Sequence, residues 1–178
     1  MTETEFSRPV PLDTLGSTPS GLSIHADEAE RAALARRFGL IALGGLAADL
    51  TLLRYEDSVT LTGRLRAQAT QACVASAAPV EAAIDEPIAL VFRPAPADGQ
   101  PDEEIELGEG EMDVMFHDGL AIDVGEAVAQ SLGLVLDPYP RAPEGEAALK
   151  HAGVKDETEA GPFAALAALK GKPKARDH

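Results

Sequence analysis

The clearest pattern along the chain is a strict alternation of apolar and polar residues from position 58 to position 70. Alternation with a period of two is typical of a strand with one buried face and one wet face. Residues 46–53 alternate in the same way, and the polar turn Glu56-Asp57-Ser58 lies between the two runs. The sequence therefore predicts two long strands joined as an antiparallel hairpin.

Three further segments carry strand signals. Residues 79–93 keep their apolar side chains on one parity, and Pro87 inside this run predicts a sheet edge or a bulge, because proline lacks the N–H that a central strand donates. Residues 6–10 and 21–25 are predicted as shorter strands, with a connection rich in Gly, Pro, Ser and Thr from 15 to 20. The three long runs are consecutive, which predicts a meander.

Two helices are predicted from their start signals. Asp27 and Glu30 have the spacing of a capping box at the start of a helix over residues 28–38. Asp123 and Glu126 repeat this spacing before a second apolar helical pattern, which Asp137-Pro138 ends. The predicted fold class is α+β: a mainly antiparallel β-sheet or partly closed barrel with two covering helices and a flexible C-terminal tail.

The C-terminal part has a different composition. Residues 1–138 are predicted to form a single domain, and residues 139–160, rich in Pro, Glu, Gly and Ala, a flexible linker. Residues 161–178 are predicted as a short helix followed by a basic tail, with Phe163, Leu166 and Leu169 recurring along one side of the helix. A helix this short is marginal in water, so the stripe predicts docking, either on the domain or on a partner.

The charge is strongly acidic and unevenly distributed. The formal net charge is -15, and no Lys or Arg occurs between Pro94 and Pro140, where many Asp and Glu residues gather. Long-range attraction to nucleic acid is therefore unfavourable, although a local basic face can still form. The acidic run is interpreted either as a solvated loop or as a partner-binding stretch.

The sequence shows no recognisable catalytic or metal-binding motif. His25, His117 and His151 are isolated, His178 is the last residue, and Cys73 is the single cysteine. A zinc site needs about four clustered ligands, and no nucleophile or phosphate-binding motif accompanies the histidines. We therefore predict that the protein is not an enzyme and has no metal, cofactor or small-molecule substrate. No run approaches the roughly 20 apolar residues of a membrane span, which predicts a soluble, cytoplasmic protein.

Three arginines are the candidates for RNA contact. Arg64 and Arg66 occupy the wet face of the strand over residues 58–70, and Arg54 is expected close to them across the hairpin. Guanidinium groups at this spacing can bind successive phosphates. The alternative is an ordinary solvated strand face, because no aromatic residue interleaves with them for base stacking.

The order of three motifs resembles a known family, the large ribosomal RNA subunit accumulation proteins, or YceD-like family, of bacteria and plastids. Its Cys-x-x-Cys-Leu-x-x-Pro-Val segment is similar to Cys73-Val74-Ala75-Ser76-Ala77-Ala78-Pro79-Val80. Its Asp-hydrophobic-x-Glu helix resembles Asp123-Val124-Gly125-Glu126. Its terminal Pro-Phe-x-x-Leu-x-x-Leu-Lys resembles Pro162-Phe163-Ala164-Ala165-Leu166-Ala167-Ala168-Leu169-Lys170.

The resemblance implies a role in the synthesis, processing or stability of large-subunit (23S) ribosomal RNA, with no established enzymatic step. Ser76 stands where the family often has a second cysteine, so a thiol pair is not possible at these two positions. Cys73 is interpreted as a small buried or half-buried residue at a strand end. The expected partner is ribosomal RNA, or alternatively a basic ribosomal protein bound by the acidic stretch 98–111. Arginines that are scattered or paired with carboxylates would favour the protein partner.

Overall fold

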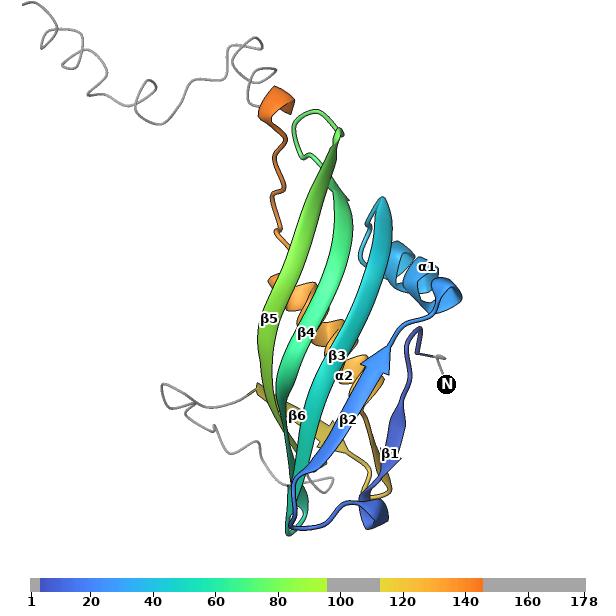
Figure 1. Cartoon of the computed structure of the whole chain (residues 1–178), viewed down its shortest axis with the longest axis vertical. Helices are drawn as coiled ribbons and strands as arrows, with labels where there is room; N and C mark the ends of the chain where they lie inside the picture. The colour runs from blue at the N-terminus through green and yellow to red at the C-terminus, as the bar shows by residue number, and fades with distance from the viewer. Residues whose placement is uncertain (1–3, 96–112, 146–178) are drawn as a thin grey trace, which may run out of the picture.

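A computed structural model describes residues 4–95 and 113–145. Its main feature is a five-stranded sheet in the order β2-β3-β4-β5-β6 (Figure 1). The strands are β2 (Ser20–His25), β3 (Ala42–Tyr55), β4 (Ser58–Ala72), β5 (Pro79–Pro94) and β6 (Asp113–His117). All neighbours are antiparallel except β5 and β6, which are parallel. The predicted hairpin and meander are confirmed, and so is the α+β fold class with a mainly antiparallel sheet and two covering helices.

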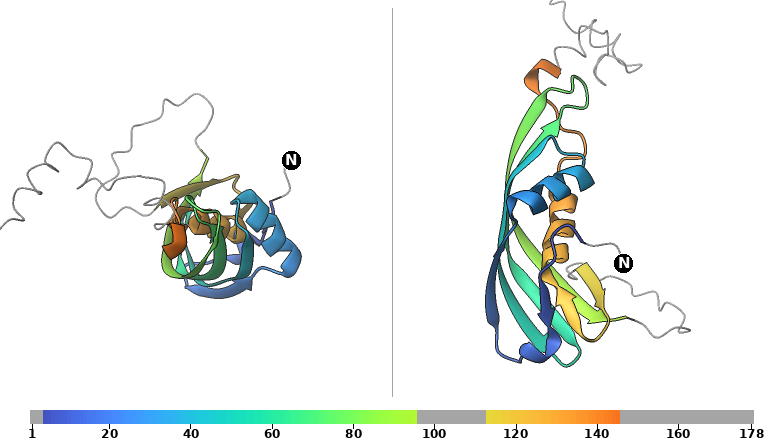
Figure 2. Two further views of the ribbon diagram at one scale, coloured as in Figure 1. Left: turned by 90° about the horizontal axis from the view of Figure 1, so that it is seen from above. Right: turned by 90° about the vertical axis from the view of Figure 1, so that its right-hand side faces the viewer.

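The long strands curl around helix α2 (Val124–Val135), which lies against the concave face of the sheet (Figure 2). The sheet stays open, because β2 and β6 are its two edges. Helix α1 (Glu28–Arg37) lies beside the upper part of β3 (Figure 1). The core is aliphatic with two fully buried phenylalanines, and α2 contributes a continuous set of buried side chains, namely Val124, Ala127, Val128, Ala129 and Leu132.

A second, two-stranded sheet joins β1 (Pro9–Pro11) to β7 (Ala121–Asp123), and the short 3-10 helix η1 (Leu12–Thr14) follows β1. The predicted strand over residues 6–10 is therefore wrong in its position. Phe6 lies before the strand and is completely buried. Its ring packs in the core, so it does not occupy one position of an alternating strand. Strands β6 and β7 lie in the acidic part of the chain, where charge conceals their short apolar runs.

Glycine is required at position 63, in the middle of β4. Gly63 faces Leu50 across the β3–β4 ladder. A Cβ at this position would overlap the carbonyl oxygen of Asp49 and lie 2.9 Å from the Cα of Leu50. The backbones of β3 and β4 thus approach each other where the sheet bends, and only a residue without a side chain permits this.

The two helix starts differ. Around α1 the capping box is complete, since Asp27 accepts from the Glu30 N–H at 2.9 Å and the Glu30 carboxylate accepts from the Asp27 N–H at 2.8 Å. At α2 the expected box is only half present. Asp123 accepts from the N–H groups of Gly125 and Glu126, but the Glu126 carboxylate instead forms a two-pronged ion pair with Arg37 at 2.7 and 2.8 Å.

Asp123 also holds the N-terminal segment against α2. Its carboxylate accepts from the Ser7 hydroxyl at 2.5 Å and from the Arg8 backbone N–H at 2.8 Å. The segment passes so close to the helix that a Cβ on Gly125 would lie 2.9 Å from the Arg8 nitrogen. Among the described residues, no helix has the length and apolar character needed to cross a membrane.

Candidate functional site

The outer, convex face of the sheet carries two of the three candidate arginines. Arg64 and Arg66 both project from β4 on the exposed side, as the alternation predicts. Their side chains remain 52% and 55% exposed, so they are accessible to a partner. Buried neighbours on the same strand, such as Leu65, face α2.

Both arginines are paired with aspartates of the neighbouring strands. Arg64 Nε donates to Asp85 of β5 at 2.5 Å, and Arg66 donates to Asp49 of β3 at 2.8 Å. Asp49 also accepts from the Ser23 hydroxyl at 2.7 Å, and the hydrogen bond from Ser23 followed by that from Arg66 lowers the pKa of its carboxyl. The charges of this cluster cancel, so the centre of the convex face is not a basic surface.

Arg54 lies on the other face of the sheet. It is directly opposite Val59, which is completely buried, and side chains that face each other across a ladder point to the same side. Its guanidinium donates to the carbonyl oxygens of Leu12 at 2.6 Å and Glu56 at 2.9 Å. The expectation that Arg54 lies with Arg64 and Arg66 is wrong. With a two-residue turn at Glu56 and Asp57, even-numbered residues of β3 share a face with odd-numbered residues of β4, so Arg54 lies opposite Val59 and on the other face from Arg64.

Cys73 closes the turn between β4 and β5. Cys73 is buried. Its N–H donates to the Ala78 carbonyl at 2.8 Å, and the Cys73 carbonyl accepts from the Ala77 N–H at 2.8 Å. The segment that follows α2 returns to this turn, where Val74 N–H donates to the Pro140 carbonyl and Ala142 N–H donates to Cys73 Sγ at 3.3 Å. The first residues of the predicted linker are thus hydrogen-bonded to the turn.

The hydrogen bond from Ala142, followed by that from the Ser76 hydroxyl, lowers the pKa of the Cys73 thiol from 9.0 to about 7. The thiol of the folded protein loses its proton near pH 7, whereas the thiol of the unfolded chain loses it near pH 9. The free energy of unfolding therefore rises with pH between about 7 and 9. We expect the urea midpoint of the wild type, relative to Cys73→Ala, to increase over this interval and to level off above it. Ser76→Ala should reduce the increase, and a constant difference from pH 6 to 10 would contradict this account.

His117 is held by hydrogen bonds to the backbone. It is buried at the end of β6, where Nδ1 accepts from the Gly119 N–H at 3.0 Å, so that the proton lies on Nε2 and is donated to the Asp57 carbonyl at 2.9 Å. Both ring nitrogens are therefore engaged by backbone groups. Within residues 4–95 and 113–145, no group of three or more His, Cys, Asp or Glu side chains is placed to hold a metal ion.

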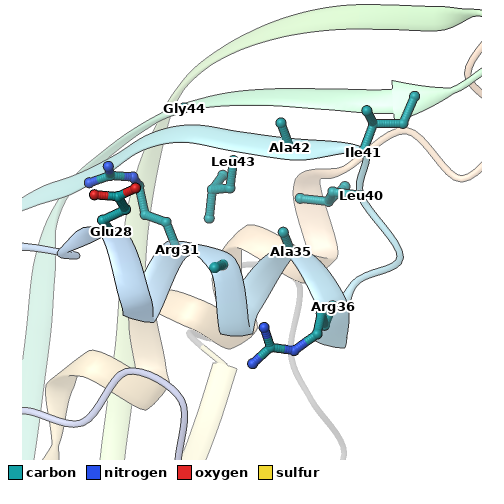
Figure 3. Close-up of a pocket in the computed structure, with 10 residues that line it drawn as sticks. Glu28, Arg31, Ala35, Arg36, Leu40, Ile41, Ala42, Leu43 and Gly44 are labelled. Carbon is teal, nitrogen blue, oxygen red and sulfur yellow. The ribbon is translucent and has the colours of Figure 1, made fainter.

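A groove of about 440 Å³ lies between α1 and the start of β3 (Figure 3). Leu40, Ile41 and Leu43 form its apolar wall, while Glu28, Arg31 and Arg36 line it from the helix. These side chains include no nucleophile and no histidine. Sequence reasoning did not find it, because it arises where helix and strand separate and no motif marks it.

Two predicted docking elements, the helix with Phe163, Leu166 and Leu169 and the acidic stretch 98–111, lie outside the described residues. Comparison with known proteins gives one family. The model described as "Large ribosomal RNA subunit accumulation protein YceD" matches residues 61–170 of the chain. Comparisons with curated proteins and with solved structures give no match.

Proposed function

The chain belongs to the YceD family of large ribosomal RNA subunit accumulation proteins, and on this basis we propose that it is a non-enzymatic adaptor in large-subunit assembly. In this proposal it supports the synthesis, processing or stability of 23S ribosomal RNA by binding a basic ribosomal protein, without contacting RNA through Arg54, Arg64 and Arg66.

The observation that carries the adaptor mechanism is the neutralisation of the candidate arginines. A phosphate that binds Arg64 competes with the Asp85 carboxylate, and one that binds Arg66 competes with the Asp49 carboxylate. Arg54 is already bound to backbone carbonyls on the other face. With a net charge of -15, the chain attracts basic proteins and repels polyanions.

A non-enzymatic role is supported by the surroundings of two described side chains, His117 and Cys73. His117 donates and accepts with backbone groups only. Cys73 lies buried in a turn, where the neighbouring Gly145 would bring a Cβ within 2.6 Å of Sγ. A substrate needs access to a reactive group, and neither of these groups offers it.

The test compares two pairs of substitutions that act on opposite members of the same ion pairs. Arg64→Ala with Arg66→Ala should leave the affinity for a 23S rRNA fragment at low salt unchanged, because the paired arginines contribute little. Asp49→Asn with Asp85→Asn should increase that affinity, with a steep dependence on salt, because the arginines are released. Filter binding on both double variants and the wild type measures this.

The opposite result restores direct RNA contact. If the wild type binds the fragment and the arginine double variant binds it at least about tenfold more weakly, a difference of about 1.4 kcal/mol, the arginines contact RNA. In cells that lack the protein, complementation with each variant then shows whether mature 23S rRNA follows RNA binding or is independent of it.

A further inference from the structure

The convex face of the sheet changes character toward the β3–β4 turn. Around Arg64 and Arg66 its outward positions are small or polar. Near the turn, the register places Leu53, Thr60, Val91 and Val114 in one row across β3, β4, β5 and β6. The next outward positions toward the turn are Tyr55 of β3 and Phe116 of β6, and the half-buried Arg93 of β5 lies opposite Phe116. We define the turn-end patch as Leu53, Tyr55, Val91, Val114 and Phe116.

The large side chains of this patch are open to solvent. Tyr55 is 73% exposed and Phe116 is 60% exposed, while Val91 and Val114 are half-buried between them. Neighbouring strands lie about 4.8 Å apart, so a row across four strands spans about 15 Å. Exposed aromatic side chains of this kind are enriched at protein interfaces, which makes the patch a candidate interaction surface.

His117 brings the two ends of the patch together. It follows Phe116 at the end of β6, and its Nε2 donates to the Asp57 carbonyl in the turn that follows Tyr55. The edge strand and the β3–β4 turn are therefore held in contact. The patch rests on a hydrogen-bonded end of the sheet, which suits a preformed binding surface.

The described surroundings of the patch carry three acidic residues against one basic residue, Arg93. Glu56 and Asp57 form the turn beside Tyr55, and Asp113 precedes Val114; all three are exposed. An apolar centre with acidic surroundings complements a partner that presents apolar side chains between basic ones.

We propose that the turn-end patch is the docking surface for a basic protein segment that presents apolar or aromatic side chains flanked by Lys or Arg. The inference rests on the proposed adaptor function and adds the surface to it. Apolar contact at the patch supplies most of the affinity, and the acidic surroundings accelerate the encounter and select a basic partner.

The experiment uses the full chain and purified large-subunit ribosomal proteins, tested one at a time by biolayer interferometry. Tyr55→Ser with Phe116→Ser should weaken binding of the recognised protein at least about tenfold, as expected for aromatic anchors. The matched control is Tyr139→Ser with Leu134→Ser, which removes two side chains of similar exposure elsewhere and should change affinity less than about twofold. Equal urea midpoints for the two double variants exclude unfolding as the cause.

A second pair of variants tests the charge. Glu56→Gln with Asp57→Asn should slow association and reduce its salt dependence, while dissociation changes little. Unchanged association would contradict the role assigned to the acidic surroundings.

The outcomes separate the two proposals. If the wild type binds none of the ribosomal proteins, the adaptor function is wrong. If it binds one and the patch variant binds that protein as tightly as the control does, the adaptor function stands and the patch is wrong. If sedimentation shows a wild-type dimer that the patch variant converts to a monomer, the surface binds a second copy, and the proposed occupant is wrong.

Discussion

Gly63→Val is expected to prevent folding, or to lower the free energy of unfolding by at least about 3 kcal/mol, the upper part of the range for overpacked interiors. The added side chain would meet backbone atoms, the carbonyl of Asp49 and the Cα of Leu50, which cannot move aside as a flexible side chain can. Both strands of the central hairpin would have to separate. Urea unfolding followed by circular dichroism measures the loss against a typical total stability of about 5–15 kcal/mol.

Gly21→Val is the matched control. Gly21 also lies in a strand of the same sheet, opposite Thr51, but a Cβ there meets no atom within 4 Å. Valine favours strand conformation, so this variant should be as stable as the wild type or slightly more so. If both variants unfold at the same urea concentration, close approach of β3 and β4 at Gly63 does not determine the bend.

The alternation of the sequence predicts the strand and its two faces, but it does not predict the bend at Gly63. The pattern over residues 58–70 identifies β4 and assigns Arg64 and Arg66 to the outer face, because each side of the strand meets one environment. Position 63 fits the same pattern as a small inward residue. That its backbone must approach the neighbouring strand follows only from the curvature of the whole sheet, which no local pattern encodes.

The candidate site illustrates the same limit. Arg64, Arg66 and their exposure were predictable from β4 alone, whereas the aspartates that neutralise them come from β3 and β5. Their pairing depends on register between strands. Arg54 was predicted on the wrong face for a related reason. The length of the turn between β3 and β4 determines which residues of the two strands share a face, and the prediction did not take it into account.

The family motifs acquire a structural meaning. The turn that contains Cys73 accepts a hydrogen bond from the Ala142 N–H of the segment after α2, and its Val74 N–H donates to the Pro140 carbonyl of that segment. The helix motif places Asp123 against the N-terminal segment and Glu126 against Arg37 of α1. Both motifs therefore join segments that are distant in the sequence.

Asp123→Ala is accordingly expected to lower the free energy of unfolding by about 3 kcal/mol. Loss of the helix cap contributes about 1 kcal/mol. The partly buried Arg8 N–H and Ser7 hydroxyl also lose their acceptor, and each unsatisfied group costs about 1 kcal/mol or more. Because the N-terminal segment opens more easily once these hydrogen bonds are lost, hydrogen exchange should accelerate at both β1 and the first turn of α2.

Two variants distinguish this network from a loss of charge. Asp123→Asn keeps an oxygen that can accept the hydrogen bonds, and asparagine is as good a helix cap as aspartate, so it should recover most of the lost stability. Asp13→Ala removes an exposed acidic residue from η1 and should change stability by less than about 0.5 kcal/mol. If Asp123→Asn destabilises the protein as much as Asp123→Ala, the negative charge is required, and shared hydrogen bonding is not the mechanism by which Asp123 joins the N-terminal segment to α2.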